Sequence, residues 1–199
     1  MRPKTLLELA GVTATPSRLS QAAVVVIDAQ REYVDGRLPL AGATAALSEI
    51  AALLARARAA ASPVIHIQHR GRPGGAFGPD TAGYPIVEAV RPETGEPVIQ
   101  KTLPNSFAGT DLKTQLDAAA MKEIIIAGFM THMCVEATAR AAIDLGLKAT
   151  VIAAATATRD LPDSLTGEAV PAAEVQRNAL TALNDRFAIV VPGLSAIPD

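Results

Sequence analysis

The sequence has one cysteine, no tryptophan and few aromatic residues, and each shortage excludes a class of protein. A single cysteine cannot build an intrachain disulfide framework or a multi-cysteine zinc site. With 3% aromatic residues, the chain lacks the stacking platforms that bind single-stranded nucleic acid. The formal net charge of −2 and the lack of lysine and arginine runs also argue against a nucleic-acid partner.

Long hydrophobic runs are lacking as well, although 49% of the residues are hydrophobic. The longest apolar stretches, such as residues 124–130, are far too short to span a membrane. The N-terminus starts with basic residues but has no apolar core long enough for a signal peptide. High hydrophobic content and low net charge exclude intrinsic disorder. We therefore expect a cytoplasmic globular protein whose 199 residues form a single domain over 1–199.

Short runs of β-branched residues alternate with helical patterns along the chain. The runs are continuously apolar, which is typical of strands buried on both faces, and they lie at 22–28, 63–69, 97–101, 123–128, 148–153 and 186–191. Residues 131–146 form one helical pattern that ends at a glycine. Three other helical stripes comprise Leu47, Ile50, Leu54, Ala57 and Ala61; Leu112, Leu116 and Ala119; and Val175, Ala179, Leu183 and Phe187. This alternation predicts an α/β fold with a mostly parallel sheet and helices on both faces.

The segment 71–97 interrupts this rhythm with the glycine- and proline-rich stretch GRPGGAFGPDTAGYP. A loop of that length in a compact domain is usually functional or mobile, so we expect a lid or a substrate loop. Arg70 and Arg72 are candidates to bind a carboxylate there, and Phe77 and Tyr84 to cover a flat ring. Exposed arginines are, equally, often only solvated. His132 is a candidate either to orient the substrate or to cap a helix.

Three reactive residues follow predicted strands at their carboxyl ends, where open α/β sheets bind ligands. Asp28 ends the first run, Lys101 ends the third, and Cys134 follows the fourth as a helix begins. With Thr131 as N-cap, Cys134 falls in the first helical turn, where the helix dipole and Lys101 favour a thiolate. Asp28 would exchange protons with the thiol and the leaving group. The set is typical of a cysteine hydrolase acting on an acyl–nitrogen bond.

Each of these residues has a simpler interpretation when it is taken alone. A lone cysteine is more often an inert buried thiol. An aspartate after a strand often caps a turn, and a lysine there is usually solvated. Their joint placement at one sheet edge is what favours a catalytic site.

Three segments then resemble signature segments of the isochorismatase-like cysteine hydrolases: VVVIDAQREYV, KTLPNSFAGTDL and GFMTHMCVEATARAAIDLG. The similarity extends over about residues 22–191. The resemblance implies that Asp28, Lys101 and Cys134 are the catalytic residues. It also implies a three-layer α/β/α, flavodoxin-like sandwich with a six-stranded sheet.

The resemblance implies further details of the site. It implies a cis peptide bond between Phe129 and Met130 and an oxyanion hole made by the backbone N–H groups of Met130 and Cys134. Members of the family are commonly dimers or tetramers, so we expect a homo-oligomer. By their places in the matching segments, the residues expected to contact substrate are Gln30, Tyr33, Phe107 and Thr131.

Nicotinamidases of this family bind a metal through an aspartate and two histidines, and the sequence departs from that pattern. The stretch Asp35–Gly36–Arg37 lacks the first histidine. His66 and His69 lie on one predicted strand, whose alternation directs them to opposite faces and makes them a poor chelating pair. We therefore predict no metal and no other cofactor, and His69 is more often a structural histidine than a ligand.

The resemblance also bears on the reaction. Isochorismatases proper cleave a vinyl ether and lack the nucleophilic cysteine, so Cys134 favours hydrolysis of a C–N bond in a small amide or carbamoyl compound. One alternative is a vinyl-ether hydrolase in which Cys134 is dispensable. The other is a non-catalytic α/β module in which Cys134 senses oxidants.

Overall fold

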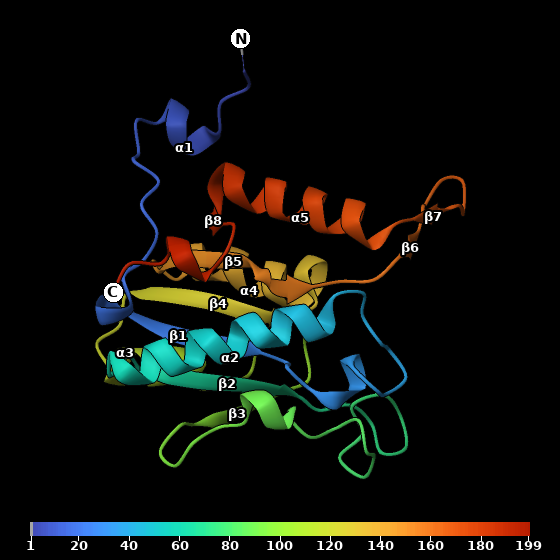
Figure 1. The fold of residues 1–199 in the computed structure, drawn as a ribbon. Helices are drawn as coiled ribbons and strands as arrows, with labels where there is room; N and C mark the ends of the chain where they lie inside the picture. Colours follow the sequence, from blue (N-terminus) through green and yellow to red (C-terminus); the bar gives the residue numbers. More distant parts are fainter. Residues whose placement is uncertain (1) are drawn as a thin grey trace.

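The computed structural model describes residues 2–199, and a parallel six-stranded sheet forms its centre (Figure 1). The strand order is β3-β2-β1-β4-β5-β8, and all five neighbouring pairs run parallel. The strands are β1 (Ala22–Ile27), β2 (Val64–His69), β3 (Val98–Lys101), β4 (Glu123–Phe129), β5 (Lys148–Ala157) and β8 (Ile189–Val191). Every side chain of β1 is buried, as its continuous apolar run predicted.

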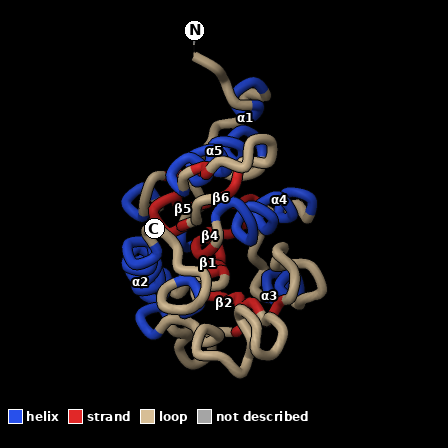
Figure 2. The backbone as a smooth tube through the Cα atoms, turned by 90° about the vertical axis from the view of Figure 1, so that its right-hand side faces the viewer, coloured by secondary structure: helices blue, strands red, loops and turns tan. Residues whose placement is uncertain are grey.

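Helices cover both faces of the sheet, so the predicted three-layer sandwich is confirmed (Figure 2). The helix α2 packs on one face, and α3 and α4 pack on the other with α5 beside α4. A short helix, α1, lies near the N-terminus, away from the sheet (Figure 1). The helices are α1 (Leu6–Leu9), α2 (Ala43–Ala59), α3 (Leu112–Ala118), α4 (Glu136–Asp144) and α5 (Ala172–Arg186). No helix within residues 2–199 has the length and apolar character needed to cross a bilayer.

The helical stripes correspond to buried faces except where a helix ends. Leu47, Ile50 and Leu54 are buried under α2, whereas Ala61 lies beyond the helix with a φ of 52° and is exposed. Strand β5 continues four residues past its predicted end at Ala153. The two-stranded sheet of β6 (Leu161–Pro162) and β7 (Ala169–Val170) was not predicted, because two-residue strands leave no periodic pattern.

The order of the strands determines where a ligand site forms. The chain winds outward from β1 through β2 to β3 and then returns to β4 on the other side of β1. This 3-2-1-4-5-6 order differs from the 2-1-3-4-5 order of flavodoxin, but it obeys the same rule: ligands bind where the winding direction reverses. The carboxyl ends of β1 and β4 therefore mark the expected crevice.

A glycine permits β1 and β4 to approach closely at this point. Gly128 has a φ of +117°, and a Cβ atom there would lie 2.0 Å from the carbonyl oxygen of Ile27. No other residue fits without moving the backbone. The tight pairing brings the last residues of both strands together directly before Asp28.

Candidate active site

The structure brings Asp28, Lys101 and Cys134 into contact at the carboxyl ends of the strands. Lys101 Nζ lies 2.7 Å from Asp28 Oδ2 and donates a hydrogen bond to Cys134 Sγ at 3.3 Å. The side chains of Asp28 and Lys101 are fully buried, and Cys134 is 3% exposed. Because β2 lies between β1 and β3, the long lysine side chain is what reaches across to the other two residues. The arrangement is a buried carboxyl, lysine and thiol in contact, in which neither Asp28 oxygen has a hydrogen-bond partner within residues 2–199.

The backbone around the three residues is irregular. Asp28 has a φ of 49°, a conformation that aspartate tolerates better than most residues. The peptide bond between Phe129 and Met130 is cis. A π-helical turn over Thr131–Val135 then carries Cys134 back over the sheet before α4 begins.

The predicted N-cap was wrong. The cap position belongs to Met130, which makes no side-chain capping bond, and Thr131 is the first residue of the π-helical turn. The Thr131 Oγ1 atom is buried and has no hydrogen-bond partner within residues 2–199. Backbone hydrogen bonds in a π-helical turn join residues five apart instead of four, and no sequence pattern indicated such a turn.

The expectation of a lowered thiol pKa is also wrong for this arrangement. Burial, followed by the charge of the Asp28 carboxylate, raises the pKa of Cys134 to about 12 despite the nearby Lys101 ammonium. Burial also raises the pKa of Asp28, and Lys101 opposes that shift only in part. The cysteine is therefore a thiol before substrate binds, and it must give up its proton as it reacts.

His69 joins the cluster from the end of β2. Its Nδ1 atom lies 3.2 Å from Lys101 Nζ, and since a lysine ammonium only donates, Nδ1 accepts. The ring proton therefore resides on Nε2. Burial and the charge of Lys101 lower the pKa of His69 to about 4, so the ring is neutral at pH 7. The sequence had favoured a structural role for this histidine.

The low pKa of His69 predicts a loss of stability in acid. The unfolded chain binds a proton at the ordinary value of 6.5, and the folded chain only near 4, so the contribution of His69 is complete above 6.5 and lost as the pH falls to about 4. This loss is on the order of 2 kcal/mol. The measurement is urea unfolding at pH 7 and pH 4, in which His69→Gln should lose less stability than the wild-type chain. An equal loss in both proteins would contradict it.

A cavity of about 200 Å³ opens above the thiol. Its walls are mostly apolar, and the aromatic rings of Tyr33 and Phe77 meet edge to face at 4.9 Å. The lining residues are Tyr33, Leu38, His69, Phe77, Pro104, Met130, Met133, Cys134 and Arg159. A small apolar cavity with a few polar groups is typical of a site for a small molecule.

Arg159 is a lining residue that the sequence reasoning missed. It follows the unpredicted extension of β5, and its Nε atom is buried without a hydrogen-bond partner in the described part of the chain. Arg70 and Arg72, the two arginines that the sequence suggested for binding a carboxylate, are exposed and do not line the cavity. The signal available in the sequence was position alone, because Arg159 follows the carboxyl end of a strand.

The expected substrate-contacting residues lie in different places. Tyr33 lines the cavity, whereas Gln30 and Thr131 do not. The Gln30 amide instead bonds the backbone of His69 and Tyr84. Phe107 does not line the cavity and packs instead against the core on the α3 and α4 face. The expectation for Phe107 is therefore corrected: its aromatic side chain fills space behind the site.

The two histidines of β2 are separated, as strand alternation predicted. His66 is 1% exposed, and its Nε2 atom contacts Glu96 Oε2 at 3.0 Å. His69 lies in the cluster around Lys101. Within residues 2–199, no three side chains of histidine, cysteine, aspartate or glutamate are grouped to bind a metal ion.

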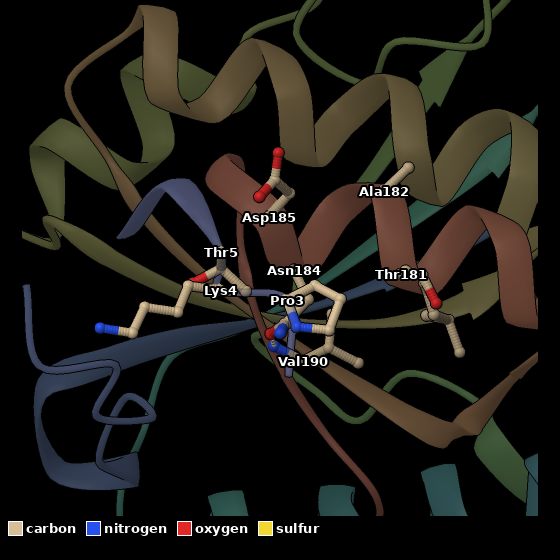
Figure 3. Close-up of a pocket in the computed structure, with 9 residues that line it drawn as sticks. Pro3, Lys4, Thr5, Thr181, Ala182, Asn184, Asp185 and Val190 are labelled. Atoms are coloured by element: carbon tan, nitrogen blue, oxygen red, sulfur yellow. Dashed lines mark hydrogen bonds between the residues drawn. The ribbon is translucent and has the colours of Figure 1, made fainter. Parts of the chain in front are cut away.

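A larger hollow lies elsewhere (Figure 3). It has a volume of about 690 Å³ and lies between the N-terminal residues Pro3–Thr5 and α5. Asp185 and Lys4 are its charged lining residues, and no cysteine or histidine lines it. The smaller cavity above Cys134 is the one with reactive groups, so it is the candidate active site.

Comparisons with known proteins agree with this geometry. The model of the isochorismatase domain matches residues 22–193. A streptothricin hydrolase of Streptomyces noursei is 39% identical over 88% of this chain, which spans 64% of that protein. A maleamate amidohydrolase of Pseudomonas putida is 31% identical over 65% of this chain and 69% of that protein.

A solved structure extends the match to nearly the whole chain. The crystal structure of an isochorismatase from Pseudomonas putida KT2440 superposes with a TM-score of 0.93 and 38% identity, covering 98% of this chain and 99% of that one. Sequence and structure thus agree over the sheet, the helices and the loops that form the site. The chain belongs to the isochorismatase-like cysteine hydrolase family.

Proposed function

We propose that the protein hydrolyses a C–N bond in a small amide or carbamoyl compound through a thioester on Cys134. The observation that carries this proposal is the contact of Lys101 Nζ with both Asp28 Oδ2 and Cys134 Sγ under a small cavity. The amidohydrolase and streptothricin hydrolase relatives support hydrolysis of such a bond.

In the first half of the reaction, Cys134 Sγ attacks the substrate carbonyl carbon while Asp28 accepts the thiol proton. Because the pKa of the buried thiol is about 12, this proton transfer must accompany the attack. The backbone N–H groups of Met130 and Cys134 would hold the oxyanion. Collapse of the tetrahedral intermediate breaks the C–N bond, and Asp28 returns the proton to the departing nitrogen.

In the second half, water attacks the thioester carbonyl carbon and Asp28 accepts one water proton. The C–S bond breaks, the sulfur regains a proton, and the carboxylic or carbamic acid leaves. Lys101 Nζ contacts both Asp28 and Cys134, so it stabilises the carboxylate and the departing thiolate in turn. The Nε2 proton of His69 is available to a substrate acceptor.

The cavity favours a substrate that carries a carboxylate. Arg159 lines a site with apolar walls, its Nε atom has no hydrogen-bond partner within residues 2–199, and guanidinium groups bind carboxylates well. The name of the maleamate amidohydrolase relative describes such a substrate, an amide of a dicarboxylic acid. The volume of about 200 Å³ suits a molecule of that size.

Arg159→Gln tests this substrate class. A hydrogen bond to a charged group contributes about 1.5–3 kcal/mol, so kcat/KM for a carboxylate-bearing amide should fall about 10- to 100-fold. The rate for a neutral amide of the same size should change less than about 3-fold. The exposed Arg70→Gln is the matched control and should change neither rate. Equal losses for both amides would contradict the assignment.

The reaction itself is tested by a panel of small amides and carbamoyl compounds, with ammonia or amine release as the measurement. Rapid quenching followed by intact-mass analysis should show the acyl group added to the protein. Since the chain has one cysteine, a thiol-sensitive adduct locates the acyl group at Cys134. Turnover without any covalent adduct, even at substrate saturation and on rapid quench, would count against the thioester.

A further inference from the structure

A buried carboxylate beside the site has no role in this mechanism. Glu32 is 2% exposed, lies in the 3₁₀ turn Arg31–Tyr33 after β1, and forms no ion pair with a basic side chain in the described residues. It does not line the cavity above Cys134. Burying an acid without a cationic partner costs folding free energy. We therefore expect its hydrogen bonds and packing to stabilise the segments that it contacts.

Glu32 holds one wall of the cavity through the residues that follow it. Its Oε1 atom accepts a hydrogen bond from the backbone N–H of Arg37 at 2.9 Å, and its carbonyl oxygen accepts from Leu38 at 3.2 Å. Gly36 permits this tight turn, because a Cβ atom there would lie 2.5 Å from the Cα of Glu32. Leu38 is the wall residue that these contacts position.

The same residue also contacts a second wall of the cavity, which belongs to the segment 71–97. The backbone N–H of Glu32 donates to the carbonyl oxygen of Gly83 at 2.8 Å, and Oε2 accepts from the N–H of Phe77 at 3.5 Å. The carboxylate also packs directly on Gly83, where an added Cβ atom would lie 1.9 Å from Oε2. Glu32 thus contacts the segment 71–97 at two positions, Phe77 and Gly83.

Phe77 is the side chain through which this arrangement reaches the substrate. It is 7% exposed, its backbone has a φ of 56°, and its ring lies 5.2 Å from that of His69. Such a backbone conformation needs support from the surrounding structure in a residue with a side chain. The carbonyl oxygen of Phe77 accepts from the N–H of Gly71 at 2.8 Å, and the Phe77 N–H faces the Glu32 carboxylate at 3.5 Å.

We propose that Glu32 is a positioning residue that sets the width of the cavity by joining the Leu38 wall to the Phe77 wall. The segment around Phe77 is then a fixed wall rather than a hinged lid, and it limits the size of the acyl group that reaches Cys134. The effect of Glu32 on which substrates are accepted rests on the proposed function. Its effect on how easily a reagent reaches the Cys134 thiol does not.

A carboxylate suits this position because it only accepts hydrogen bonds. Both of its oxygens face backbone N–H groups, from Arg37 and Phe77. In Glu32→Gln, the amide NH₂ must face one of these donors, so one of the two contacts is lost. The variant keeps the shape of the side chain and changes only what it can bind.

The test uses Cys134 as a probe and needs no substrate. Iodoacetamide and the bulkier N-benzyliodoacetamide are reacted with the folded protein at pH 9, and the ratio of the two alkylation rates measures the width of the access. We expect Glu32→Gln to raise the ratio of bulky to small reagent about 5- to 10-fold, by analogy with the loss of one buried hydrogen bond. Glu88→Gln is the matched control, because Glu88 is an exposed acid of the same segment, and it should leave the ratio unchanged.

An unchanged ratio in Glu32→Gln would overturn the proposal. This holds whether both alkylation rates stay constant or both rise equally, as a purely destabilising substitution would cause. Gly83→Ala provides a second variant if Glu32→Gln does not fold, since its methyl group must displace the Glu32 carboxylate and should raise the same ratio.

Steady-state kinetics with an amide that the protein hydrolyses then test this proposal independently of the proposed function. We expect KM for a small amide to rise about 5-fold in Glu32→Gln with kcat changed less than about 2-fold, because the reacting groups are untouched. If the alkylation ratio rises while no amide is hydrolysed by any variant, the wall is correct and the proposed function is wrong. If amides are hydrolysed but the alkylation ratio stays constant, the proposed function is supported and the role of Glu32 in the wall is wrong.

Discussion

Cys134→Ser is expected to lower amide turnover by about 10⁴-fold or more, since single replacements of a nucleophile in other hydrolases have effects of this size. The hydroxyl fills nearly the same space as the thiol but is far less acidic. Asp28 would have to deprotonate a group even weaker than a thiol whose pKa is about 12. The measurement is kcat/KM with the amide found in the substrate panel.

The fold should survive this replacement. Cys134 is 3% exposed, and the serine oxygen is smaller than sulfur, so the melting temperature should stay within about 5 °C of the wild-type value. Turnover comparable to the wild type would contradict the thioester. If the chain cleaved a vinyl ether equally well with and without the thiol, the alternative hydrolase would be favoured.

The redox alternative predicts a different pattern. A sensor thiol reacts with low doses of peroxide to give a sulfenic acid and requires no amide hydrolysis. Reactive cysteines of this kind have lowered pKa values, whereas burial raises that of Cys134. Rapid oxidation by peroxide, together with no turnover of any amide, would nevertheless establish it over the hydrolase.

Much of the site could be predicted because its residues end strands. Asp28 directly follows the buried strand β1, Lys101 ends β3, in which only alternate side chains are buried, and parallel strands deliver their carboxyl ends to one edge. The pattern does not reveal how deeply the side chains at that edge are buried. The prediction of a thiolate at Cys134 was wrong for this reason. Burial raises the pKa of the thiol more than the helix dipole and the lysine charge lower it, and burial depends on segments far away in the sequence.

The cavity walls were harder to predict than the reactive groups. Arg159 reaches the site because β5 continues through the alanine-rich residues 153–157 past a register shift opposite β4. Alanine carries little strand preference, so the extension leaves no signal. Phe107 shows the opposite error, in which a matching segment places a residue near the site but its side chain packs into the core.

The ion pair of Asp28 and Lys101 gives the second large prediction, which concerns stability. Replacing Lys101 by methionine leaves the Asp28 carboxyl buried without a counter-charge and should cost about 3–5 kcal/mol at pH 7. The exposed Lys122→Met is the control and should change stability by less than about 0.5 kcal/mol. Urea unfolding at constant pH measures both.

The pH dependence of the Lys101→Met variant follows from the raised pKa of Asp28. Burial raises that pKa already in the wild type, and loss of the ammonium removes the main opposing charge. Between the ordinary value of 3.8 and the raised one, the folded chain binds the proton that the unfolded chain has released. The stability of the variant should therefore fall as the pH rises from about 4, and lie closest to the wild type in acid. A constant deficit over this range would contradict the assignment.

The double variant Asp28→Asn/Lys101→Met separates the stability of the pair from its chemistry. Asparagine tolerates the φ of 49° at position 28, and with both charges gone no unpaired ion remains in the core. Because buried ion pairs are often replaceable by neutral groups at little cost, the double variant should recover at least about 2 kcal/mol over Lys101→Met. Turnover should stay as low as in either single variant, since the proton acceptor is gone. If stability did not recover, the pair would be needed for folding itself; if activity returned, neither residue would belong to the catalytic machinery.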